Sequence, residues 1–163
     1  MLLSAVLLSL AACGNGHTLG LTSPQLQELL RLINQTRASS EVKCRGVKQN
    51  PAPPLQSEGH LIWSAQMHAE DMAKAGILSH DTPPGAVHFR AGTSPEERIV
   101  SSGYLPRAWG ENIARGQTTP QQVLHDWLAS TEGHCEALMR PDYVHAGLGK
   151  SGDYWVLDMA APQ

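Results

Sequence analysis

The stretch WGENIARG, residues 109–116, sets a single carboxylate between residues that suit a functional site. Glu111 stands between Gly110 and Asn112, in a segment with neither a clear helical nor a clear strand pattern. The glycine lets the backbone approach a neighbour closely, and the asparagine amide can tie the loop to its surroundings. A solvated surface glutamate needs no such setting. We therefore predict that Glu111 points into a pocket, as a candidate general base or metal ligand.

Two of the eight histidines also lie in constrained positions. His80 follows a helix and a turn, and His134 follows a glycine just after a predicted helix. Two neutral imidazoles and one carboxylate suit Zn²⁺ or another divalent cation with an open position. The spacing of His80, Glu111 and His134 is no metal signature by itself, so these residues form a site only if the fold brings them together. The others are interpreted as surface or packing residues: His17, His60, His68, His88, His125 and His145.

Composition and motifs exclude several other functions. The chain has 163 residues, 41% apolar and 17% charged, which suits one globular domain with a sizeable core. The net charge is −3 and no basic block is present, so we expect no nucleic-acid partner. The sequence has no Gly-x-Ser-x-Gly, no His-Glu-x-x-His and no phosphate-binding glycine loop. His134 and Cys135 are adjacent, but neighbours on a helix point about 100° apart and cannot easily hydrogen-bond.

The N-terminus predicts export. MLLSAVLLSLAAC is an apolar run too short to span a bilayer, and its end resembles the bacterial lipobox. We predict a signal peptide at residues 1–12, lipidation of Cys13, and a tether at residues 13–22 that holds the protein on a membrane. Gly14, rather than Asp, favours the outer membrane if the cell is Gram-negative. The alternative is an ordinary cleaved signal peptide, because no Lys or Arg precedes the run.

Cys44 and Cys135 remain for the domain itself. Two cysteines in an exported domain most simply form one disulfide. Closing a loop of this length would stabilise the fold by roughly 4–5 kcal/mol. A thiol-ligated metal is the alternative, although no Cys-x-x-Cys spacing supports it.

Patterning predicts helices first and strands last. Caps and apolar periodicity predict helices that begin at about residues 24, 58, 95, 120 and 133. Residues 144–149 and 154–159 flank a turn and predict an antiparallel hairpin, which another strand or a helical layer must cover. Residues 40–57 are expected to be an extended loop, and residues 81–93 a Gly- and Pro-rich loop that could be mobile. This order indicates an α+β fold.

Seven motifs in order resemble the CAP superfamily (cysteine-rich secretory proteins, antigen 5 and pathogenesis-related proteins), or SCP domain, in its bacterial exported lipoprotein branch. They are LLRLINQTRA, LIWSAQMHAEDMA, LSH, ERIVSSGY, GENIARG, WLASTEGHCEALM and the closing GLG and YWVLDM pair. The resemblance implies an α–β–α sandwich with a three-stranded antiparallel sheet between helical layers, at residues 23–163. The GHC motif implies the disulfide-bearing version.

The resemblance also implies a cavity lined by two histidines and two acidic residues, which holds a divalent cation in several members. Matching motifs assign His80, Glu111 and His134 to this cavity. The fourth position, a glutamate in eukaryotic members, is Ser130 here, and nearby Glu132 is the alternative. The cluster holds zinc or another divalent cation, or else it is a hydrogen-bonded His–Glu–His group that only ties loops together.

Three functions follow, ranked in this order. The first is a non-enzymatic binding module at the cell envelope, with a lipid, a wall fragment or a protein as ligand. The second is a structural envelope protein with a vestigial pocket. The third is a metal-dependent peptidase or esterase in which Glu111 acts as general base.

Overall fold

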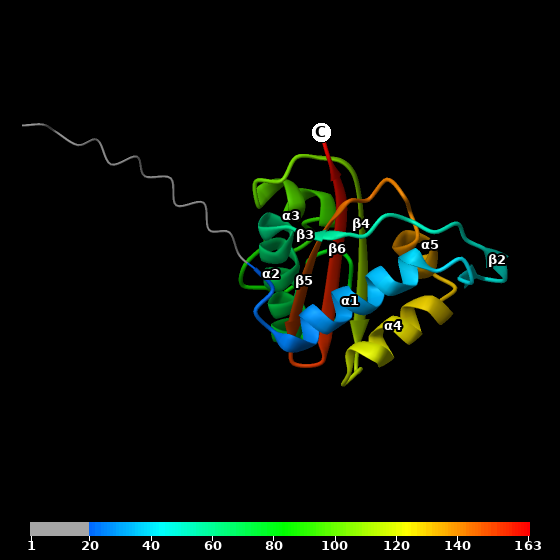
Figure 1. The fold of residues 1–163 in the computed structure, drawn as a ribbon. Coiled ribbons are helices and arrows are strands. Elements are labelled where there is room, and N and C mark those ends of the chain that lie inside the picture. Colours follow the sequence, from blue (N-terminus) through cyan, green and yellow to red (C-terminus); the bar gives the residue numbers. More distant parts are fainter. Residues whose placement is uncertain (1–19) are drawn as a thin grey trace, which may run out of the picture.

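The computed structural model describes residues 20–163 (Figure 1). The predicted signal peptide and the predicted lipidation of Cys13 lie outside these residues. None of the helices in residues 20–163 has the length and apolarity needed to cross a membrane.

The helices begin close to the predicted caps. Their bounds are α1 (Pro24–Ala38), α2 (Gly59–Ala75), α3 (Pro95–Ser101), α4 (Pro120–Ala129) and α5 (His134–Leu138). The Glu58 side chain caps α2, and Gly76 ends that helix in the left-handed conformation, with φ of 73°. Ser94 and Glu97 form the predicted capping box of α3. Local sequence therefore determines the helix starts.

The main sheet contains the predicted hairpin. Its strands are β3 (Gln56–Ser57), β5 (His145–Ser151), β6 (Tyr154–Pro162) and β4 (Pro106–Arg115), in that spatial order. β5, β6 and β4 pair antiparallel, as expected, and the two-residue β3 adds a parallel edge beside β5. A second small hairpin joins β1 (Lys43–Cys44) to β2 (Val47–Lys48) within the segment expected to be an extended loop.

The expectation that WGENIARG is irregular was wrong. Residues 109–115 belong to β4, which pairs with β6 from Pro106 opposite Pro162 to Arg115 opposite Tyr154. Gly, Glu and Asn are poor strand formers, but pairing with the buried strand β6 decides the conformation. The candidate carboxylate Glu111 is thus held by a sheet rather than by a loop.

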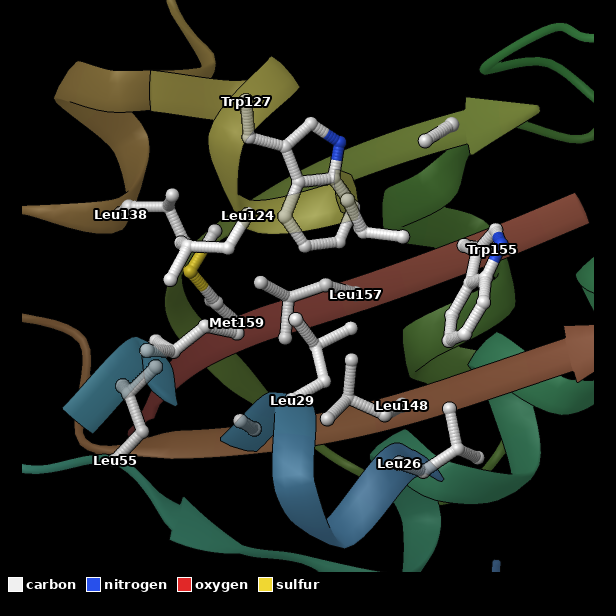
Figure 2. Packing of buried hydrophobic residues seen from close by; sticks show 14 of the residues in the cluster. Leu26, Leu29, Leu55, Leu124, Trp127, Leu138, Leu148, Trp155, Leu157 and Met159 are labelled. Carbon is white, nitrogen blue, oxygen red and sulfur yellow. The ribbon is translucent and has the colours of Figure 1, made fainter. Parts of the chain in front are cut away.

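Helices cover both faces of the sheet, which confirms the α+β sandwich (Figure 1). Alternate residues of β6 face opposite layers. Trp155, Leu157 and Met159 pack with α1 and α4, whereas Tyr154 and Val156 pack with α2. Figure 2 shows the first of these layers, where the Trp127 indole lies above Leu157 and close to Leu124. The indole also donates to the Ile113 carbonyl at 3.0 Å, which fixes α4 against β4.

The predicted disulfide joins Cys44 to Cys135, 91 residues apart. Both cysteines are buried against Met139. The disulfide ties the β1–β2 hairpin to α5, the helix that carries His134.

Replacing Cys44 and Cys135 together with serine is expected to lower the free energy of unfolding by about 4 kcal/mol, because the unfolded chain regains the entropy of a long loop. Urea unfolding of the variant and the oxidised wild type measures this difference. A loss below about 1 kcal/mol would contradict the loop-entropy explanation.

Candidate functional site

His80, Glu111 and His134 come from three separate segments and lie close together. His80 Nδ1–H donates to Glu111 Oε1 at 2.8 Å. The ring centroids of His80 and His134 are 6.5 Å apart. The His80 side chain is about half exposed, at 51%, whereas the Glu111 side chain is only 1% exposed. The carboxylate is therefore buried beneath the half-exposed imidazole of His80.

A buried arginine, Arg98 on α3, holds the other oxygen of the carboxylate. Its Nη2 donates to Glu111 Oε2 at 2.7 Å and to the His80 carbonyl at 2.8 Å. Its Nη1 donates to the Thr93 carbonyl at 2.8 Å and to the Thr82 hydroxyl at 3.2 Å. One guanidinium thus fixes both ends of the 80–93 loop and the candidate carboxylate.

The charge of Glu111 depends on these partners. Burial alone would raise its pKa, but the hydrogen bond from His80 and the positive charge of Arg98 outweigh burial and lower the pKa. Both carboxylate oxygens are occupied by protein donors. Glu111 is therefore a buried anion that orients His80.

A second buried carboxyl group, Asp158 on β6, lies opposite Glu111 in the strand register. Burial raises the pKa of Asp158 well above its ordinary value, and the charge of Glu111 raises it further. Ser64 and Glu111 are polar neighbours of Asp158, and a hydrogen bond to Glu111 favours its protonated form. Because one guanidinium cannot balance two buried carboxylates, Asp158 is the member of the pair that keeps its proton.

His134 is held by its own helix start. Its Nδ1 lies 2.8 Å from Ser130 Oγ, and the Asn112 side chain donates to the His134 carbonyl at 3.1 Å. Burial lowers the pKa of His134, and the neighbouring His80 lowers it further. The imidazole is therefore neutral at neutral pH, the form in which histidine binds metal. Asn112 ties β4 to α5, and its amide was expected to tie this segment to its surroundings.

Of the two candidates for the fourth position, Ser130 lies beside His134 and Glu132 is exposed. Ser130 Oγ also accepts the Glu132 backbone N–H at 3.0 Å. Among residues 20–163, no group of three or more His, Cys, Asp or Glu side chains is arranged to hold a metal ion. The side chains of the cluster that remain available to a metal ion are the two imidazoles. These two imidazoles fit a loosely held divalent cation and do not fit a closed structural zinc site.

Two supporting residues, Arg98 and Asp158, were not found from the sequence. Asp158 had a usable signal, because it is the one acidic residue in the apolar run YWVLDMAA. A lone carboxylate in a buried strand indicates a partnered or protonated group. Arg98 follows two exposed glutamates at the start of a short helix and resembles a surface residue in sequence.

The other histidines within residues 20–163 mostly agree with their interpretation, and His17 lies outside these residues. His68 is fully buried on α2, and its Nε2 lies 2.9 Å from the Ser79 carbonyl. His125 is exposed. The exception is His145, expected at the surface, which is partly buried and lies 2.8 Å from the Tyr104 hydroxyl through Nδ1.

The loop at residues 81–93 is fixed to α2 by Asp71, although it was expected to be mobile. The buried Asp71 carboxylate accepts three consecutive backbone N–H groups, from Val87, His88 and Phe89, at 2.6 to 3.0 Å. Three such bonds to one anion hold the loop at a defined position. Asp71 therefore fixes the middle of the loop that follows His80, and Arg98 fixes its two ends.

Replacing His80 with glutamine is expected to destabilise the protein more at about pH 5.5 than at about pH 8.5. The hydrogen bond to Glu111 raises the folded-state pKa of His80. The stabilisation of the fold by protonated His80 is complete below the pKa that His80 has in the unfolded chain. This stabilisation is lost as the pH rises through the higher pKa of His80 in the folded protein. Urea midpoints at the two pH values test this, with exposed His125→Gln as the control. An equal loss at both pH values would contradict it.

Solved structures share this fold at low sequence identity. An extracellular protein containing an SCP domain from Bacillus anthracis gives a TM-score of 0.67 at 22% identity, over 83% of this chain and 39% of that protein. An outer surface protein from Borrelia burgdorferi gives the same TM-score and identity, over 91% of this chain and 99% of that protein. The fold is that of the SCP-domain proteins.

The model of the cysteine-rich secretory protein family, CAP, matches residues 30–158, and the chain belongs to this family. The uncharacterized protein YkwD of Bacillus subtilis is 35% identical over 104 residues, which are 63% of this chain and 37% of that protein. The uncharacterized membrane protein YlbC of the same organism is 33% identical over 88 residues, 54% of this chain and 23% of that protein. The chain thus spans little more than a third of the first relative and about a quarter of the second.

Proposed function

We propose that this CAP domain is an exported, lipid-anchored binding module of the cell envelope, and that its ligand site is the His80–His134 pair. The observation that carries the proposal is the state of Glu111. Its two oxygens are used by His80 and Arg98, and its side chain is almost fully buried. The glutamate serves to orient an imidazole.

This arrangement disfavours the hydrolase alternative. A general base must present a free oxygen to the water or hydroxyl whose proton it takes. Glu111 has a lowered pKa and presents neither oxygen at the surface. The sequence also supplies no nucleophile motif. Binding therefore accounts for the site better than hydrolysis does.

The two imidazoles are prepared for a ligand. Each ring has its Nδ1 on a protein partner, Glu111 for His80 and Ser130 for His134. In the neutral His80 ring, Nδ1–H donates to Glu111, and Nε2 is the nitrogen that can bind a metal. His134 offers its Nε2 in the same way when its Nδ1–H donates to Ser130 Oγ. A divalent cation such as Zn²⁺ would be held by these two Nε2 atoms and would supply a positive centre for an oxygen donor of the ligand. A lipid headgroup, a wall fragment and a protein side chain all carry such donors.

Three features support the envelope location. The N-terminal sequence resembles a lipoprotein signal. A disulfide between Cys44 and Cys135 is typical of an oxidising compartment. The similar solved structures are described as an extracellular protein and an outer surface protein.

Calorimetric titration with Zn²⁺, after elemental analysis of protein purified without added metal, tests the proposal. We expect one reversible site in the wild type and an affinity lower by more than about tenfold in His80→Ala and His134→Ala. His125→Ala, which removes an exposed histidine outside the cluster, should bind as the wild type does. Equal affinity in all four proteins, or no binding in the wild type, would refute the proposed site.

A further inference from the structure

A second surface feature is an apolar pocket at the beginning of the described chain, with a volume of about 590 Å³. This volume is typical of ligand sites. The lining consists mainly of apolar side chains from the N-terminal segment, α1, α2 and β5. The apolar side chains are Leu21, Leu26, Ile62, Trp63, Met67 and Leu148. The pocket shares no residue with the His80–His134 pair.

An aromatic pair borders this pocket. Trp63 on α2 is 36% exposed, and its ring meets Phe89 edge to face at 5.6 Å. Phe89 is in turn fixed by the hydrogen bond from its backbone N–H to Asp71. A tryptophan with one side packed and one side open is the side chain that proteins place at the boundary between water and lipid. The pair therefore forms a rigid apolar rim.

The charge around the pocket suits a phospholipid surface. Lys150 lines the pocket, and its Nζ lies 4.9 Å from the centroid of the Trp155 ring. No acidic residue is among the described residues that line the pocket. A lysine beside an apolar surface can meet an anionic headgroup while the apolar side chains meet the acyl region.

The predicted anchor keeps this pocket near the membrane. Gly20, Leu21 and Ser23 line the pocket, and Cys13 precedes Gly20 by seven residues. Seven residues span at most about 25 Å when fully extended. A lipid on Cys13 would therefore hold this pocket within about 25 Å of the bilayer.

We propose that the pocket and its Trp63–Phe89 rim form the face on which the domain rests against the bilayer, with phospholipid acyl chains as the occupant. This inference rests on the lipid anchor of the proposed function. The acyl chains on Cys13 supply the attachment, and the rim sets the orientation. The His80–His134 pair, built from other residues, then has a defined direction relative to the membrane.

The test uses the full lipidated chain in phosphatidylcholine vesicles that contain phosphatidylglycerol and acyl chains labelled with bromine. We expect the bromine to quench tryptophan fluorescence in the wild type and to quench little in Trp63→Phe. Trp127 and Trp155 are fully buried and Trp109 is partly buried, so they report poorly on lipid. Near-ultraviolet circular dichroism verifies that Trp63→Phe folds.

The matched control places the exposed tryptophan on the other side of the molecule. Val47 on β2 is 65% exposed, and Figure 1 shows β2 and α2 on opposite sides of the fold. In Trp63→Phe, a further Val47→Trp substitution should give an exposed tryptophan that brominated lipid does not quench.

Three outcomes would overturn the inference in distinguishable ways. Protein that fails to float with the vesicles would overturn the anchor and this orientation together. Protein that floats without quenching of Trp63, including a dimer that covers the rim, would overturn the orientation alone. Equal quenching at residues 63 and 47 would indicate a tethered domain that tumbles freely, which also overturns it.

Discussion

Replacing Arg98 with methionine is expected to lower the free energy of unfolding by about 3–5 kcal/mol. The guanidinium is fully buried and donates to Glu111, to the His80 and Thr93 carbonyls and to the Thr82 hydroxyl. Without it, the buried Glu111 carboxylate loses the charge that compensates it, next to a second buried carboxyl group on Asp158. Removing one partner of a buried ion pair is costly for this reason.

Chemical denaturation of Arg98→Met measures this loss. Arg31→Met is the matched control, since Arg31 is exposed and pairs with Glu28 on the surface of α1. Arg31→Met should lower the free energy of unfolding by less than about 1 kcal/mol. Adding Glu111→Gln to Arg98→Met should recover part of the stability, because it removes the unpaired charge. An Arg98→Met loss as small as that of the control would show that the buried pair does not hold the site together.

Replacing Gly147 with alanine is expected to lower the free energy of unfolding by about 3 kcal/mol or more, because the added methyl group overlaps other atoms. A Cβ atom there would lie 2.0 Å from the Leu61 carbonyl carbon and 2.2 Å from the Ile62 nitrogen. Both are backbone atoms of α2, so a rotamer change cannot relieve the overlap. Gly149 faces the next turn of the helix in the same way, with the Ala65 carbonyl carbon 2.4 Å away. The glycines of β5 therefore let α2 lie directly on the sheet.

Thermal and urea unfolding of Gly147→Ala test this close packing. Gly20→Ala is the control, because a Cβ atom at Gly20 meets nothing within 4 Å. The control should unfold within about 0.5 kcal/mol of the wild type. A mild effect at position 147 would mean that α2 can move away from β5 at little cost.

Local signals in the sequence were sufficient for the helices and the hairpin. The capping box at Ser94 and Glu97 and the left-handed Gly76 satisfy backbone groups within one or two turns. The turn after Ser151 joins β5 and β6 as predicted. Such features depend on neighbours in the chain, so a single sequence contains the information for them. The export predicted from the N-terminal sequence also favoured the disulfide between Cys44 and Cys135 that the structure contains.

The conformation of β4 could not be predicted locally. Its strand character comes from pairing with β6, whose residues lie about 45 positions later in the chain. The same non-local pairing brings Asp158 against Glu111. The site residues His80, Glu111 and His134 were assigned by resemblance, since their spacing alone predicts no contact. Arg98, which fixes Glu111, lies within the ERIVSSGY motif, but nothing in the sequence indicates that its side chain is buried against Glu111.

These long-range contacts also explain why the surroundings of Glu111 could not be derived from the sequence. The sequence predicted only that Glu111 points into a pocket, as a candidate general base or metal ligand. The strand directs it under His80 and onto Arg98. A carboxylate that is almost fully buried and engaged by both His80 and Arg98 controls the direction of the His80 ring.

The central claim is that His80 and His134 present their Nε2 atoms to a ligand while Glu111 and Ser130 hold the Nδ1 atoms. Nitrogen NMR of the imidazole rings during Zn²⁺ titration tests it most directly. The predicted spectrum has a protonated Nδ1 on His80, because the Glu111 carboxylate only accepts, and zinc shifts the Nε2 resonances of both histidines together. A larger shift at Nδ1 than at Nε2, a shift at one ring alone, or a shift at neither ring would contradict the claim.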